Sequence, residues 1–146
     1  MALYHNILAK IDEYNLRTYG NIRVYGQENM DCIPLDKIIE LSEYPIIGIL
    51  KLIKMIHYDY EENKNIYIDP YDDDLVHIFL GDRWQPTPLS KILYKLVSQT
   101  FKQLENNSLD INQEKIAILK CRIDDRDEKL LKFMDEQLRE ILKKNE

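Results

Sequence analysis

The stretch NIYIDPYDDDLVHIFLGDRW, residues 65–84, decides the fold of this chain. Two runs within it, 65–69 and 75–80, are rich in β-branched and aromatic residues and predict strands. The segment Pro70–Asp74 and the pair Gly81-Asp82 predict the turns, and an extended run resumes before the tryptophan. The stretch therefore predicts an antiparallel meander, which needs helices over one face because isolated hairpins are only marginally stable.

Helical periodicity surrounds the meander on both sides. Upstream, a helix is predicted from Pro34, and a second helix over 45–56 is apolar almost all round. Downstream, Thr87-Pro88 predicts a helix start, with the threonine as its cap. We also expect an amphipathic helix over 1–14 and a short strand over 21–25. Together these elements predict an α+β domain, in which a small antiparallel meander packs on helices and a long C-terminal helix follows.

The charge of the chain is concentrated in one segment. The chain has 146 residues, which suits one domain, and its 20 basic and 26 acidic residues give a net charge of −6. Residues 59–74 hold seven acids against Lys64 alone. Proteins that bind nucleic acid through its phosphates are usually basic, so nucleic acid is the less favoured partner.

Cysteine usage and hydropathy indicate an intracellular protein. Cys32 and Cys121 are far apart and follow no metal-binding spacing, so we expect two free thiols. The longest apolar-rich stretch, Pro45–Met55, contains two lysines and is too short to span a bilayer. The first residues do not have the pattern of a secretory signal. We therefore expect no association with a membrane.

The C-terminal part predicts one long amphipathic helix over 110–144. Asn106-Asn107-Ser108 should separate it from the core, which divides the chain into a core domain, 1–107, and an association helix, 108–146. We name the apolar residues of this helix the tail stripe: Ile116, Leu119, Ile123, Leu130, Phe133, Met134, Leu138 and Ile141. A stripe this long does not stay in water, so it predicts a homo-oligomer, and back-packing onto the preceding helix is the alternative.

Four short motifs carry a resemblance to a known family. They are YGQENMDCI at 25–33, LIKMIHY at 52–58, ENKNIYI at 62–68 and GDRW at 81–84. Their order resembles a domain that occurs repeatedly in giant DNA viruses such as mimiviruses and phycodnaviruses. That domain often follows a zinc finger or a KilA-N, BRO-like or MSV199-type DNA-binding domain. The resemblance covers roughly residues 20–105 and implies a viral origin, but the family brings no established activity.

The polar residues of these motifs are expected to specify the fold rather than to perform chemistry. Gly26 favours a turn with positive φ, and Glu28 and Asn29 can cap a turn or a helix through their side-chain oxygens. Asparagines before a strand can fix its start through local hydrogen bonds. The structural motif residues are Gly26, Glu28, Asn29, His57, Asn63, Asn65 and Trp84.

The sequence contains candidate residues for three kinds of chemical site, and none of these sites is expected. Cys32 and His57 are possible zinc ligands, but no further ligand stands at the required spacing. His57 and His77 could serve an HNH-like nuclease, but the converging acids and histidines of such a centre are missing. The acidic turn 69–74 lacks the spacing of an EF-hand calcium loop. We therefore predict no catalytic residue, no metal and no cofactor.

These observations favour a non-enzymatic viral module for protein interaction and oligomerisation. Its expected partners are a second copy of the chain and a viral or host protein. The alternative is a nucleic-acid-associated accessory factor of a giant DNA virus, and an HNH-like nuclease remnant is the third hypothesis. The resemblance implies a location in the host cytoplasm, in the virus factory or in the virion.

Overall fold

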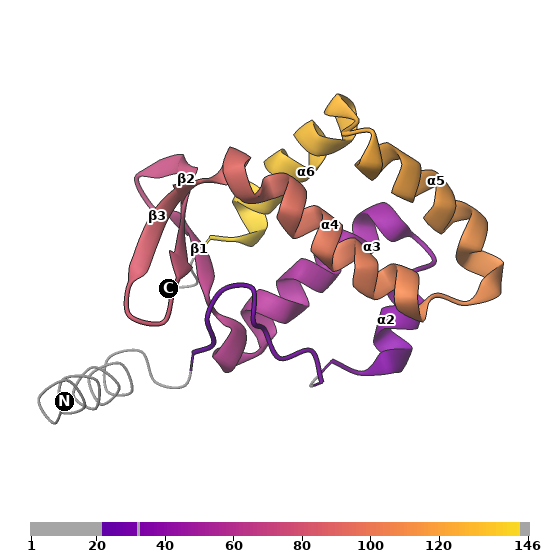
Figure 1. Ribbon diagram of the computed structural model, residues 1–146, viewed down its shortest axis with the longest axis horizontal. Helices are drawn as coiled ribbons and strands as arrows, with labels where there is room; N and C mark the ends of the chain where they lie inside the picture. The colour runs from indigo at the N-terminus through magenta and orange to yellow at the C-terminus, as the bar shows by residue number, and fades with distance from the viewer. Residues whose placement is uncertain (1–21, 32, 144–146) are drawn as a thin grey trace, which may run out of the picture.

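The computed structural model describes residues 22–31 and 33–143, and it places a small sheet at one end of a helical layer (Figure 1). The elements are α2 Leu35–Leu41, α3 Pro45–Lys54, β1 Ile66–Asp69, β2 Asp72–Phe79, β3 Trp84–Pro88, α4 Leu89–Asn107, α5 Gln113–Asp124 and α6 Glu128–Ile141. A π-helical turn, Met55–Asp59, continues α3. The predicted α+β class and the antiparallel meander are confirmed.

The sheet has the order β1-β2-β3, and its two faces differ in character. Alternation along the strands places Ile66, Ile68 and Val76 on the face that packs into the core, where each is at most 3% exposed. The other face carries aromatic rings. Tyr67 lies 4.9 Å from the ring of His77 and 5.1 Å from that of Trp84, measured between ring centroids.

Helix α4 is the centre of the helical layer. It contacts α2, α3, α5 and α6, and in Figure 1 it crosses between α3 and the last two helices. Its buried residues recur at helical spacing from Leu89 to Leu104, as the sequence indicates. The predicted cap is wrong, however, because Thr87 still belongs to β3, where it pairs with Val76.

The single helix predicted over 110–144 is wrong, because the chain turns between α5 and α6. Arg126 adopts a left-handed conformation with φ of 52°, which a continuous helix does not allow. The side chain of Asp127 accepts a hydrogen bond from the backbone N–H of Leu130 and caps α6. The two helices therefore meet at a corner (Figure 1).

The tail stripe is not a free surface, because most of it lies in the core of its own chain. Ile116, Leu119, Ile123, Leu130, Met134 and Leu138 are at most 3% exposed and belong to one cluster with the buried residues of α3 and α4. Ile141 packs on the edge of this cluster, and Phe133 is 41% exposed. Back-packing, the alternative stated from the sequence, is what the structure shows for α5 and α6, which both contact α4.

The end of α6 is also fastened to the sheet. The backbone N–H of Ile68 in β1 donates to the carbonyl oxygen of Leu142 at 2.7 Å. Arg139 pairs with Asp74 of β2 at 2.8 Å. These contacts join the last described residues to the predicted meander.

The two elements predicted in the N-terminal part are not found in the described structure. The helix expected over 1–14 lies outside the described residues. Residues 22–25 of the expected strand form an irregular segment instead. Two of its backbone N–H groups, those of Arg23 and Tyr25, donate to the carbonyl oxygens of Glu62 and Phe79.

The burial of the tail stripe predicts a large loss of stability on truncation of its buried members. We expect Leu138→Ala to lower the free energy of unfolding by about 2–5 kcal/mol, because it leaves a cavity among α3, α4 and α6. Phe133→Ala on the same helix is the control and should cost less than about 1 kcal/mol. Urea unfolding measures both values, and equal small losses would contradict the packing of α6 into the core.

Candidate functional site

Asn63 fastens the irregular segment 22–31 to the residues that precede β1. Its side-chain oxygen accepts from the backbone N–H of Asn29 at 2.8 Å, and its side-chain amide donates to the carbonyl oxygen of Asn29, also at 2.8 Å. Asn63 is fully buried. The pair imitates the bonding of two adjacent strands, so the segment needs no strand partner here.

Asn65 and Glu28 form the second connection. The Asn65 amide donates to the carbonyl oxygen of Arg23 at 3.2 Å and to Oε1 of Glu28 at 3.1 Å. The same carboxylate oxygen accepts from the backbone N–H of Gly26 at 3.0 Å. Gly26 has a φ of 93°, so the turn at this position favours glycine, as the sequence indicates.

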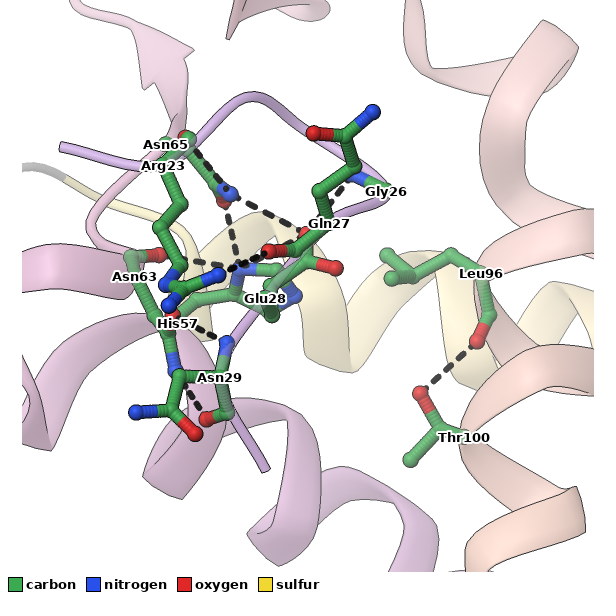
Figure 2. Close-up of polar contacts among 10 residues, drawn as sticks. All are labelled: Arg23, Gly26, Gln27, Glu28, Asn29, His57, Asn63, Asn65, Leu96 and Thr100. Carbon is green, nitrogen blue, oxygen red and sulfur yellow. Dashed lines mark hydrogen bonds and ion pairs between the residues drawn. The ribbon is translucent and has the colours of Figure 1, made fainter. Parts of the chain in front are cut away.

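His57 lies at the centre of these contacts (Figure 2). Its Nδ1 is 2.8 Å from Oδ1 of Asn65 and 3.2 Å from the carbonyl oxygen of Asn63. The side chain is 3% exposed, and burial lowers its pKa below the usual value, while Glu28, Asn65 and Asn63 act in the opposite direction. We name the group formed by Glu28, Asn29, His57, Asn63 and Asn65 the motif cluster.

The structure brings six of the seven motif residues together and leaves one apart. Gly26 joins the motif cluster through its bond to Glu28. Trp84 lies instead on the aromatic face of the sheet, with its ring 5.3 Å from that of Phe79. Sequence reasoning missed Arg23 and Glu62, whose 3.2 Å ion pair closes the edge of the cluster beside Asn29.

The candidate metal ligands do not assemble in the described part of the chain, where no three His, Cys, Asp or Glu side chains form a group that could hold a metal. Cys32 lies outside the described residues. His77 bonds Oδ2 of Asp69 at 2.7 Å on the acidic turn, and this bond is the first cause of the lowered pKa of Asp69. The other oxygen of Asp69 accepts from the backbone N–H of Tyr71, so this carboxylate stabilises the turn.

An exposed apolar surface, which the sequence prediction missed, lies where the α2–α3 turn meets α5. We name Tyr44, Ile47 and Ile118 the α5 surface; their exposed fractions are 67%, 51% and 57%. They line a groove of about 450 Å³ together with the rim residues Lys115 and Arg122. One feature of the sequence could have indicated this surface: the 45–56 helix is apolar on all sides, and a helix at the surface cannot bury every side.

Comparisons with known proteins add no relationship: the chain matches no protein-family model, no curated protein and no solved structure. In the part that the structure describes, no helix has the length and apolar character required to cross a membrane.

The reciprocal pair between Asn63 and Asn29 predicts a sensitive position. Asn63→Ala removes both hydrogen bonds between this side chain and the backbone of Asn29, so we expect a loss of about 2–4 kcal/mol in the free energy of unfolding. Asn106→Ala, an exposed asparagine on α4, is the control and should change it by less than about 0.5 kcal/mol. An unchanged urea midpoint for Asn63→Ala would show that the segment 22–31 is held by other contacts.

The lowered pKa of His57 predicts a defined pH dependence. Because the folded pKa lies below the unfolded value of 6.5, protons bind preferentially to the unfolded chain. The contribution of neutral His57 is therefore complete above pH 6.5 and is lost as the pH falls below it, by at most about 1.4 kcal/mol per pH unit. We expect His57→Gln to be less stable at pH 7.5 and to flatten this loss. Parallel urea titrations that show the same slope in both proteins would contradict the assignment.

Proposed function

We propose that this protein is a non-enzymatic interaction module that associates with a second copy of itself through the α5 surface. The observation that supports the proposal is the gathering of three large apolar side chains, each more than half exposed, around one groove. Monomeric proteins rarely leave such a patch in water, and patches of this kind mark interaction sites. The proposed oligomer therefore forms through the α5 surface and not through the tail stripe, which is mostly buried.

The charges on α5 favour a second copy as the occupant. In a two-fold dimer the same patch meets itself, and two α5 helices that cross at Ile118 run antiparallel when the two-fold axis is perpendicular to them, which is the arrangement proposed here. Glu114 stands four residues before Ile118 and Arg122 four residues after it. Such a crossing sets Glu114 of each copy opposite Arg122 of the other, which gives two complementary pairs around an apolar centre.

The side chains at the edge of the groove are compatible with this arrangement. Arg122 uses its Nε to bond Asp127 at 3.1 Å, which leaves its two terminal nitrogens for a further carboxylate. Lys115 lies over the Tyr44 ring, 5.1 Å from its centroid, and donates to the carbonyl oxygen of Glu43. The aromatic ring is thereby held at the rim of the groove, where it can cover the partner's isoleucine.

The cellular setting of the module rests on the motif resemblance alone. We propose that it acts in the cytoplasm of a cell infected by a giant DNA virus, in the virus factory or in the virion. The polar bonds of the motif cluster support a structural rather than a catalytic role for His57, since its Nδ1 is already shared between two acceptors.

Charge reversal on α5 tests the proposed dimer. We expect light scattering to report a dimer for the full-length chain at about 100 µM. Glu114→Arg and Arg122→Glu should each be monomeric alone, because each places like charges opposite one another. When the two variants are mixed, opposite charges meet at both positions and a heterodimer should form.

The control is the pair Lys132→Glu and Glu136→Arg, which reverses two exposed charges of opposite sign on α6. These variants should remain dimeric. Thermal melts check that each variant is folded, which matters for Arg122→Glu because this change also removes the bond to Asp127. The proposal is contradicted if the full-length chain is monomeric. It is also contradicted if the mixture stays monomeric while both variants are folded.

A further inference from the structure

A cavity of about 380 Å³ lies between the segment 25–30 and helix α4, on the far side of the motif cluster from β1. Its polar wall is formed by Glu28, His57 and Thr100, and its apolar wall by Met30, Ile56 and Leu96. In Figure 2 the motif residues stand on one side of this space, and Leu96 and Thr100 on the other. The volume falls in the range of small-molecule sites, which combine apolar walls with a few converging polar groups.

The imidazole of His57 presents a hydrogen-bond acceptor to this cavity. Both partners of Nδ1, the carbonyl oxygen of Asn63 and Oδ1 of Asn65, can only accept, so the proton of the neutral ring is on Nδ1. Nε2 then carries a lone pair and forms no hydrogen bond within the described residues. Figure 2 shows this second ring nitrogen on the side of the ring that faces α4.

Glu28 adds a negative charge beside the imidazole, with its Oε1 4.0 Å from Nδ1 of His57. Its Oε1 already accepts from Gly26 and Asn65, whereas Oε2 has no hydrogen bond in the part of the chain that the structure describes. The side chain is 15% exposed, so solvent screens it weakly. A carboxylate in such a position gains most from a partner that is itself positively charged.

The remaining polar groups point to a donor as well. The Thr100 hydroxyl donates its proton to the carbonyl oxygen of Leu96 at 2.8 Å, so its oxygen can only accept from the cavity. The hydroxyl of Tyr25, another residue of the wall, is buried without a hydrogen bond among the described residues. Buried polar atoms without a partner are rare in folded proteins.

We propose that this cavity binds the ammonium group of a small primary alkylamine. The three N–H donors of the ammonium meet Oε2 of Glu28, Nε2 of His57 and the Thr100 oxygen, all of which accept. The alkyl chain lies along Met30, Ile56 and Leu96. Lys102 stands at the rim and disfavours a second positive charge, so a monoamine fits better than a diamine. This site is separate from the α5 surface, and neither proposal depends on the other.

An NMR titration of the full-length chain with n-butylammonium tests the proposal. We expect saturable shifts confined to residues 25–30, His57 and 96–106, with putrescine binding more weakly. Glu28→Gln keeps an oxygen for Gly26 and Asn65 but removes the charge, and it should weaken binding about tenfold. Thr100→Val removes one acceptor at nearly constant volume and should weaken it severalfold.

Two controls keep the outcome decisive. Glu136→Gln, a change in an exposed carboxylate on α6, should bind as the unchanged protein does, and n-butanol should not bind. Absence of saturable shifts up to about 10 mM, equal binding of n-butanol, or unchanged binding by folded Glu28→Gln would each overturn the proposal. A lysine blocked at both ends of its backbone distinguishes the source of the ammonium: tighter binding than n-butylammonium identifies a protein side chain, and weaker binding a free amine.

Discussion

The N–H of the buried His57 imidazole, shared between the carbonyl of Asn63 and the side chain of Asn65, is the contact on which the arrangement of this fold depends. It joins the π-helical end of α3 to the residues that enter β1. Asn63 and Asn65 in turn hold the irregular segment 22–31 in place, because their side-chain amides donate to the carbonyl oxygens of Asn29 and Arg23. The helical layer, the sheet and this segment therefore share one buried polar centre. Its acceptors cannot be left unpaired without a large desolvation cost.

The motif cluster also explains how a segment without regular structure can be part of a folded domain. Backbone groups near the core must be paired, and strands or helices usually provide the partners. Here asparagine and glutamate side chains provide them instead, which requires polar residues at fixed positions rather than a hydrophobic pattern. The resulting cavity beside α4 follows from the same design. Side chains that are committed on one side, as those of Glu28 and His57 are, present their remaining acceptors on the other.

The meander and helices α3 and α4 could be predicted from the sequence because each contains its own signal, whether alternation, turn residues or apolar periodicity. The corner between α5 and α6 could not be predicted in this way. Ile123 and Leu130 are seven residues apart, which is close to two helical turns, so the apolar pattern stays in phase across the break. Only the capping role of Asp127 and the left-handed Arg126 distinguish the corner from a continuous helix, and neither residue type is specific enough alone.

A regular hydrophobic stripe predicts that one face of a helix is buried. It does not predict whether the same chain or another chain covers that face. The apolar residues of the tail stripe recur at regular helical spacing, and for that reason they were predicted to form the interface. Such regular spacing is a property of the helix face that packs into a core. An apolar residue that remains exposed, such as Tyr44 or Ile118, does not belong to the regular buried pattern. The motif residues could be named in advance, but their convergence required the fold, since Asn29 and Asn63 are 34 residues apart in sequence. Surfaces for association are therefore best sought among the apolar residues that are not buried in the core. Polar sites are best sought where separate motifs meet in the fold.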